Sequence, residues 1–205
     1  FQTANPKMRF LSIQVFALVV MFVRNFVQLW LSQRRLLIMD NTHIIICGLG
    51  GQGIIFTEKI FSFCLSNAGY DVKVSEIHGL AQRGGSVCAE ISYGNKVFSP
   101  VIEEGKANVI VSFEYQQTFQ YLSKLQHNGK IIVKSPLITT SFPSKYKCLT
   151  ITDSSFNNIS FLGILVKELN LQNLNWQSSI ANYVEDKYLE KNLKSFNLGL
   201  KFNNN

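Results

Sequence analysis

Short apolar runs and helix-like periodicities alternate along the chain after residue 40. Residues 43–47 (HIIIC) form an unbroken apolar and β-branched run, as buried parallel strands do. Over residues 53–67 the apolar positions recur every three or four residues, which predicts a helix that stops at Gly69. Residues 70–76 alternate in polarity and predict a second strand. The strand, helix and strand together indicate a right-handed βαβ unit and a parallel sheet.

The same alternation continues towards the end of the chain. Residues 87–93 and 96–99 flank the turn residues Gly94 and Asn95, which predicts a β-hairpin. The other expected elements are strands over residues 107–113, 130–133 and 148–151 and helices over residues 115–125, 158–169 and 175–196. We therefore expect an α/β fold with a Rossmann-like, open and mostly parallel sheet, helices on both faces and a β-hairpin insertion.

Residues 1–38 differ in character from the rest, since they hold five basic residues and no acidic one. Residues 10–31 are apolar over about the length of a membrane-spanning helix, but Arg24 interrupts them. Met39 stands directly before a polar cap and the first strand, so we expect the natural start there and one catalytic-type domain over residues 39–205. The preceding segment would then be an upstream or fragmentary piece; a membrane or interfacial anchor and a genuine helical extension are the alternatives.

Charge and cysteine spacing exclude several classes of function. Of the 20 Lys and Arg residues, five fall in the first 38 positions, which leaves 15 against 13 Asp and Glu, so we expect no nucleic-acid partner. The four cysteines show no CxxC and no zinc-type spacing to histidine, so we expect no metal or iron–sulfur site in this chain. Each cysteine adjoins apolar residues, which predicts buried thiols and a reducing, cytoplasmic location.

A glycine-rich segment is the main candidate for chemistry. Gly48, Gly50 and Gly53 match GxGxxG between the first strand and the first helix. Glycines there allow a tight turn and let an anionic group reach the amides of the helix N-terminus, which predicts a phosphate-bearing ligand. A tight turn without a ligand is the alternative. Glu76 ends the second strand, where nicotinamide-binding folds place a ribose-binding carboxylate, so a stand-alone nicotinamide-binding domain is a second alternative.

Two phrases, GLGGQG at residues 48–53 and GYDVKVSEIHGLAQRGGSV at residues 69–87, resemble the gamma-type domain of 2-oxoacid:ferredoxin oxidoreductases. The resemblance extends over residues 43–202, and SEIHGLAQRGGSV is more similar to the indolepyruvate (arylpyruvate) type than to the pyruvate or 2-oxoglutarate types. The sequence departs from the family at Lys134, where Asn is more frequent, and at Ser195, where Ala is usual.

The resemblance implies that the chain is the non-thiamine subunit of an enzyme that converts an arylpyruvate to aryl-acetyl-coenzyme A while reducing ferredoxin. Thiamine diphosphate and 4Fe-4S clusters would then reside in an alpha-type partner subunit, coenzyme A would be the co-substrate, and this chain would be inactive alone. A gamma subunit for pyruvate, 2-ketoisovalerate or 2-oxoglutarate is the nearest alternative. A membrane association is expected only if residues 10–31 are a genuine anchor.

We expect neither a catalytic residue nor a metal ligand in this chain. The candidate cofactor-binding residues are those of the two glycine-rich phrases: Gly48, Gly50, Gly51, Gln52, Gly53, Gln82, Arg83, Gly84 and Gly85. Arg83 is the foremost candidate, since its guanidinium can present a planar fork to a phosphate or carboxylate, although a structural ion pair with Glu76 or with a partner subunit is an alternative. Glu114, at a strand end, is either a ligand contact or a helix cap.

Overall fold

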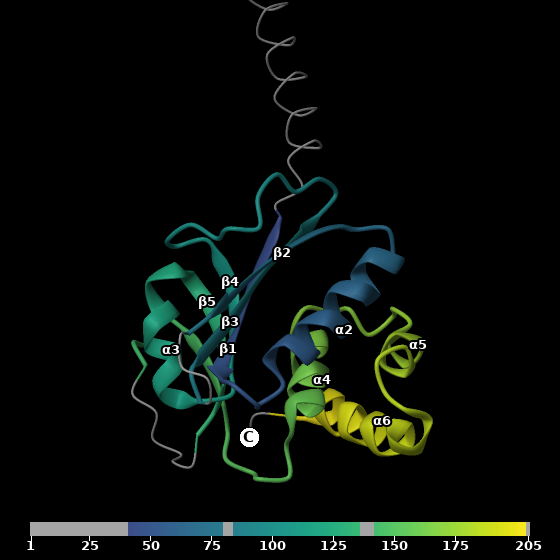
Figure 1. The fold of residues 1–205 in the computed structure, drawn as a ribbon. Helices are drawn as coiled ribbons and strands as arrows, with labels where there is room; N and C mark the ends of the chain where they lie inside the picture. The colour runs from purple at the N-terminus through teal and green to yellow at the C-terminus, as the bar shows by residue number, and fades with distance from the viewer. Residues whose placement is uncertain (1–40, 80–83, 136–141, 204–205) are drawn as a thin grey trace, which may run out of the picture. The chain divides into compact units, whose positions relative to one another are not determined.

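The computed structural model describes residues 41–79, 84–135 and 142–203. Three predicted features lie outside this described part: the candidate membrane anchor at residues 10–31, Gln82 and Arg83. Residues from Asn41 onward form one compact unit (Figure 1). Its strands are β1 (Thr42–Leu49), β2 (Asp71–His78), β3 (Ser86–Gly94), β4 (Ala107–Ser112), β5 (Leu125–Lys134) and β6 (Lys147–Ile151). Its helices are α2 (Ile54–Asn67), α3 (Tyr115–Tyr121), α4 (Asn158–Glu168), α5 (Trp176–Ala181) and α6 (Asp186–Lys201), with a short 3₁₀ helix η1 (Leu122–Lys124) after α3.

The strands form one mixed sheet in the order β2-β3-β1-β4-β5-β6. β1, β4, β5 and β6 are mutually parallel, whereas β3 is antiparallel to both β1 and β2. The expected α/β class, the mostly parallel sheet and the presence of an inserted hairpin are confirmed. The βαβ prediction is wrong in one respect, because β3 occupies the place beside β1 that the second strand was expected to take.

The hairpin consists of β2 and β3, not of residues 87–93 and 96–99 as the sequence predicts. After Gly94 the chain leaves the sheet, and the Val97 amide donates a hydrogen bond to Asp71 Oδ2 at 2.8 Å. The reason is that both edges of β3 are occupied. β3 pairs along its full length with β1 on one side and β2 on the other, so the short segment before Pro100 has no free edge of β3 to join.

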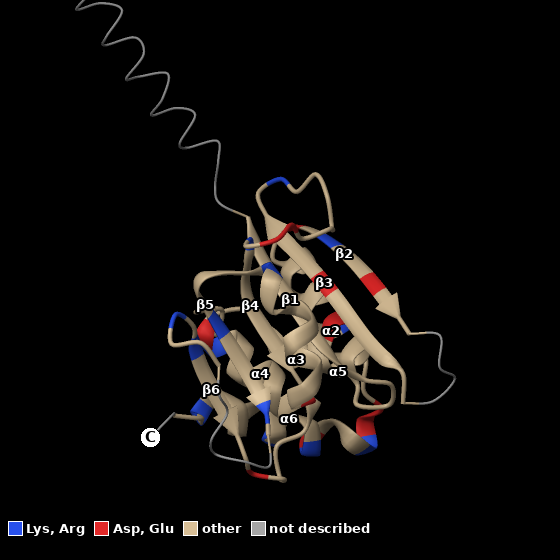
Figure 2. Cartoon of the chain, turned by 90° about the vertical axis from the view of Figure 1, so that its left-hand side faces the viewer, with Lys and Arg blue, Asp and Glu red and all other residues tan. Residues whose placement is uncertain are grey.

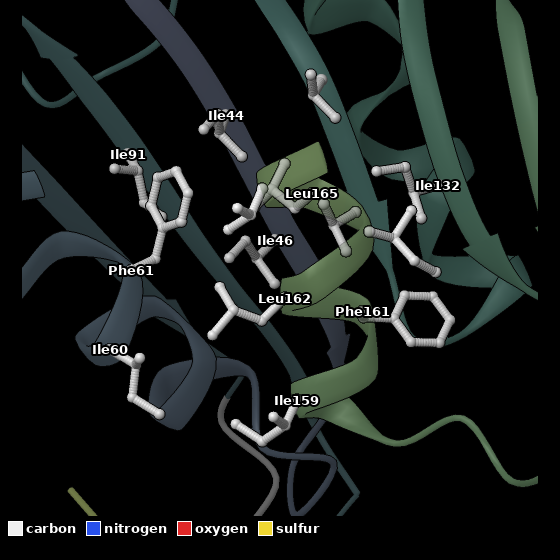
Figure 3. Close-up of a cluster of buried hydrophobic side chains, with 14 of the residues drawn as sticks. Ile44, Ile46, Ile60, Phe61, Ile91, Ile132, Ile159, Phe161, Leu162 and Leu165 are labelled. Atoms are coloured by element: carbon white, nitrogen blue, oxygen red, sulfur yellow. The ribbon is translucent and has the colours of Figure 1, made fainter. Parts of the chain in front are cut away.

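Alternating residues of the sheet supply two apolar layers. In β1, Ile44 and Ile46 face the large core that contains α2 and α4, while Ile45 and Cys47 belong to the smaller core beneath α3. Figure 3 shows Phe61 of α2 and the apolar side chains of α4 gathered over the first of these faces. Burial of each such side chain contributes about 1.5–3 kcal/mol to the free energy of unfolding, so this core holds α2 and α4 against the sheet.

Helices α4 and α6 approach each other through two glycines. A Cβ atom built on Gly163 would overlap the Phe196 carbonyl oxygen, and one on Gly199 would overlap the Ser160 carbonyl oxygen. The backbones are therefore in direct contact, which fixes α6 against the helix whose N-terminus lines the site described below.

The expected helix over residues 175–196 is divided into α5 and α6, with a break over residues 182–185. Trp176 and Ile180 are buried and hold α5 against α2, and Trp176 Nε1 also donates to the Leu171 carbonyl at 2.8 Å. Helix α6 instead packs on α4. One straight helix would not satisfy both contacts, which explains the break.

The two edges of the sheet differ in charge. Figure 2 shows acidic and basic residues together on β2, an acidic residue on β3, and basic residues on β5 and β6. Lys130 of β5 pairs with Glu168 at the end of α4 at 2.9 Å. Within the described ranges, no helix is both long and apolar enough to cross a membrane.

Candidate functional site at the carboxyl edge of the sheet

The glycine turn connects the end of β1 to the start of α2. Gly51 and Gly53 have φ angles of 94° and 85°, which side-chain-bearing residues rarely adopt. The Gln52 side chain closes the turn, since its Oε1 accepts a hydrogen bond from the Leu49 amide at 2.8 Å. Gly53 is the N-cap of α2, and no side chain of the described residues caps this helix, so amides of its first turn lack a side-chain partner there.

A second glycine segment adjoins this turn. The Gly50 amide donates to the Gly85 carbonyl at 2.8 Å, and the neighbouring Gly84 has a φ of 67°. The structure thus brings together the two glycine-rich phrases through Gly50 and Gly85, which are 35 residues apart in the sequence. Gln82 and Arg83, the other candidates of this segment, are not among the described residues.

A pocket of about 600 Å³ lies beside the glycine turn. Its wall includes Gln52 of the turn, Glu114 after β4, Lys134 at the end of β5 and Thr152 after β6, together with the start of α4. It therefore opens at the carboxyl ends of the four parallel strands. The helix after β1 covers one face of the sheet and the helix after β4 the other, so this is a topological switch point, where open α/β sheets bind ligands.

Glu114 faces this pocket and does not cap a helix. It occupies the N-cap position of α3 but makes no side-chain capping bond there. Its Oε2 instead accepts a long hydrogen bond from Gln52 Nε2 at 3.5 Å, and its carbonyl accepts one from Ser112 Oγ at 2.6 Å. The capping alternative is wrong, and the carboxylate is free to contact a ligand.

Sequence reasoning missed two other pocket residues as site candidates, Lys134 and Asn157. Lys134 Nζ donates to the Phe156 carbonyl at 3.2 Å. Asn157 caps α4, accepting from the Ser160 amide at 3.0 Å, and its Nδ2 donates to Ser195 Oγ at 3.1 Å. The Ser195 hydroxyl, which the usual Ala lacks, thus orients the Asn157 side chain that caps α4. The sequence feature that could have identified Lys134 is its position at the end of a predicted parallel strand.

Glu76 does not lie where a nicotinamide-binding fold requires it. It is on β2 at the sheet edge, and β3 separates it from β1 and the glycine turn. Its Oε2 is 3.2 Å from Nε2 of His78, and His78 is exposed. The arrangement argues against the nicotinamide alternative.

The cysteines do not form a cluster site. Cys47 and Cys88 are direct cross-strand neighbours in β1 and β3, and burial raises the pKa of each thiol to about 12. Cys64 is also buried and Cys148 is partly exposed; none of the four forms a disulfide within the described residues. Burial is thus confirmed for three of the four. In the part of the chain that the structure describes, no group of three His, Cys, Asp or Glu residues could hold a metal ion, so the residues present do not fit an iron–sulfur cluster.

The chain has sequence relatives among subunits of indolepyruvate oxidoreductases. The indolepyruvate oxidoreductase subunit IorB of Pyrococcus horikoshii is 29% identical over 194 residues, which cover 80% of this chain and 96% of that protein. The subunit of the same name from Thermococcus kodakarensis is 38% identical over 97 residues, 47% of this chain and 48% of that protein. The second match therefore spans about half of each chain.

Solved structures share the fold. The gamma subunit of a keto/oxoacid ferredoxin oxidoreductase from Geobacter sulfurreducens superimposes with a TM-score of 0.65 at 22% identity, covering 78% of this chain and 96% of that chain. A 2-oxoglutarate:ferredoxin oxidoreductase from Magnetococcus marinus superimposes with a TM-score of 0.64 at 16% identity, covering 80% of this chain and 32% of that chain. Residues 43–202 match the family model of pyruvate ferredoxin/flavodoxin oxidoreductases. That match covers more than half of the sequence, and the chain belongs to the pyruvate ferredoxin/flavodoxin oxidoreductase family.

Proposed function

We propose that this chain is the non-thiamine subunit of an indolepyruvate:ferredoxin oxidoreductase. The observation that carries the proposal is the family match over residues 43–202, supported by two relatives named as indolepyruvate oxidoreductase subunits. The overall reaction consumes an arylpyruvate, coenzyme A and two oxidised ferredoxins. It yields aryl-acetyl-coenzyme A, carbon dioxide, two reduced ferredoxins and a proton.

The redox and carbon–carbon cleavage chemistry belongs to a partner in this proposal. Thiamine diphosphate, bound by an alpha-type subunit, would supply the electron sink that decarboxylation of a 2-oxoacid requires. The described cysteines are dispersed over the fold, so 4Fe-4S clusters are also assigned to the partner, which passes electrons to ferredoxin. The enzyme is expected to work in the cytoplasm.

The contribution of this chain is to hold coenzyme A at the mouth of the partner's site. Two glycine segments, Gly48 to Gly53 and Gln82 to Gly85, supply backbone amides and the Arg83 guanidinium, groups that favour phosphate oxygens. Gln52 braces the first segment through its bond to Leu49. The contact between Gly50 and Gly85 supports this assignment, since both segments then serve one ligand.

The proposal is tested by reconstitution. The full chain and its alpha-type partner are purified separately and mixed, and ferredoxin reduction is followed with coenzyme A and each of indolepyruvate, pyruvate, 2-ketoisovalerate and 2-oxoglutarate. We expect no activity from this chain alone and the highest kcat/KM for indolepyruvate with the mixture. A higher kcat/KM for another 2-oxoacid would assign the chain to the corresponding alternative subunit. Undiminished activity of the partner alone would refute a role in the reaction.

A further inference from the structure

We infer that the surface around α3 and η1 is a two-fold interface between two copies of this chain. This surface, called the α3 surface below, lies on the face of the sheet opposite to α2 and α4 (Figure 1). It has an aromatic centre, acidic residues on one side and lysines on the other: Tyr115, Phe119 and Phe142, then Glu103 and Glu104, then Lys145 and Lys147. Pairing of two copies is independent of the proposed function, because it needs no other subunit.

The centre of the α3 surface is a cluster of three aromatic rings. Phe119 is 46% exposed, although phenylalanine is ordinarily buried. Its ring centroid lies 5.2 Å from that of Tyr115 and 5.4 Å from that of Phe142, so two neighbours hold the side chain while part of it remains in solvent. A well-supported, half-exposed aromatic side chain is typical of the centre of a protein–protein interface.

Acidic residues lie on the β4 side of η1. This 3₁₀ helix leads directly into β5, and β5 lies between β4 and β6 in the sheet. The turn that enters β4 carries Glu103 and Glu104, both exposed, and its Gly105 amide donates to the Ser123 carbonyl of η1 at 3.0 Å. The two glutamates and the exposed Lys106 give this turn a net charge of −1.

Basic residues lie on the other side of η1, where the chain enters β6. Lys145 and Lys147 are both exposed, and the Tyr146 hydroxyl between them donates to the Leu122 carbonyl of η1 at 3.5 Å. Residues 142–147 contain these two lysines and no acidic residue, so their net charge is +2. The two sides of η1 therefore carry opposite charge.

Two copies related by a two-fold axis near η1 would match these groups. The rotation exchanges the β4 side with the β6 side, so the acidic turn of each copy meets the lysines of the other, and the same contact forms twice. Phe119 lies one helical turn before η1, which brings the two Phe119 side chains together near the axis. In the part of the chain that the structure describes, the four charged residues form no ion pair within their own copy.

This arrangement of charge favours a second copy over a different partner. A surface of one sign would indicate a partner of the opposite sign. The α3 surface instead carries both signs on opposite sides of an apolar centre, which makes it complementary to itself, as an isologous interface must be.

Sedimentation velocity of the full chain over a range of concentrations tests the inference, and we expect a reversible monomer–dimer equilibrium. Phe119→Ser should raise the dissociation constant of the dimer about tenfold or more, the effect of losing a central aromatic side chain. The matched control is Tyr188→Ser, which removes an exposed aromatic side chain of α6, the helix that packs on α4. This control should leave the dissociation constant unchanged.

Charge reversal tests the two-fold arrangement itself. Glu103→Lys with Glu104→Lys makes both sides of the α3 surface basic, and Lys145→Glu with Lys147→Glu makes both sides predominantly acidic. Each double variant should raise the dissociation constant about tenfold through like-charge repulsion, whereas a mixture of the two should form a heterodimer. A variant with all four changes should dimerise as the unchanged chain does, because its charges are exchanged rather than lost.

A chain that is monomeric at every concentration would overturn the inference. A dimer that Phe119→Ser and both double variants leave unchanged would overturn it as well, because the copies would then meet elsewhere. Failure of the variant with all four changes to dimerise would contradict the two-fold arrangement. Thermal unfolding confirms that each variant folds, so that loss of the dimer is not mistaken for loss of the fold.

Discussion

The backbone amide of Gly50 donates a hydrogen bond to the carbonyl oxygen of Gly85 at 2.8 Å. This bond joins the turn after β1 to the segment that leads into β3, so two glycine-rich phrases form one surface at the carboxyl edge of the sheet. Both glycines lie beside glycines with positive φ, Gly51 and Gly84, a conformation that glycine adopts without steric cost. The loop that carries Arg83 is consequently anchored next to the glycine turn at its Gly84–Gly85 end.

Arg83→Ala should leave the fold intact and lower the activity of the assembled enzyme. Loss of a charged, bidentate contact to a phosphate costs about tenfold or more in affinity, so the KM for coenzyme A should rise by at least that factor. Steady-state kinetics of the reconstituted enzyme provide the measurement, with Arg83→Lys as the variant that keeps the charge and loses the fork. Full activity of Arg83→Ala would remove the role assigned to this residue.

Gly199→Ala should destabilise the protein through the contact between α4 and α6. The added Cβ would overlap the Ser160 carbonyl oxygen, so one helix must shift, at a cost of about 1–3 kcal/mol in the free energy of unfolding. Urea denaturation measures this difference. Leu198→Ala, at an exposed position of the same helix, should change it by no more than about 0.5 kcal/mol. Equal stabilities of the two variants would show that the helices are not in backbone contact.

Asn157→Ala should remove the N-cap of α4. A lost cap costs about 1 kcal/mol, and Asn157→Ser should restore most of it because serine is also a favourable N-cap. Ser195→Ala removes only the bond from Asn157 Nδ2 and should cost less than the loss of the cap. Thermal unfolding of the three variants gives the order, and a Ser195→Ala loss as large as that of Asn157→Ala would contradict this division of roles.

Glu58 should make the protein less stable as the pH rises, whereas a carboxylate in an ion pair makes a protein less stable as the pH falls. Burial raises the pKa of Glu58, an effect only partly offset by the hydrogen bond from Ser62 and reinforced by the nearby charge of Glu76. Because the folded chain binds this proton more tightly than the unfolded chain, the stabilisation is complete below the ordinary glutamate pKa. It is lost as the pH rises through the raised folded-state value.

Glu58→Gln should therefore be as stable as the unchanged protein or more stable, by up to about 1 kcal/mol, at pH 8, and should lose that advantage at pH 4. Urea denaturation at the two pH values measures the difference, with Glu104→Gln in an exposed turn as the control. A Glu58→Gln variant less stable at pH 8 than at pH 4, relative to the unchanged protein, would show that the carboxylate is stabilising when charged.

Sequence reasoning predicted local features well. The run at residues 43–47, the glycine turn and the helix that follows it are encoded within about 25 consecutive residues, and the structure confirms all three as β1, the turn and α2. The approximate positions of the later strands also follow from local alternation, except that residues 96–99 form no strand and β5 begins at Leu125, before the predicted start at residue 130. These elements were predictable because their periodicity reflects burial against neighbours in the same segment.

The features that the sequence did not reveal depend on distant segments. β3 lies between β1 and β2, but the residues of β3 do not indicate which strands it pairs with. The pocket likewise combines Glu114 after β4, Lys134 at the end of β5 and Asn157 before α4, so no sequence spacing could have grouped them. Only the topology places these strand ends together.

The central claim is that this chain is one subunit of a thiamine-dependent oxidoreductase. Its most direct test is isolation of the full, affinity-tagged chain from its native host, followed by mass identification of associated chains and analysis for thiamine diphosphate and iron. The account predicts a larger partner that carries both. Recovery of the chain without a partner, thiamine or iron, under conditions where the host oxidises arylpyruvates, would contradict it.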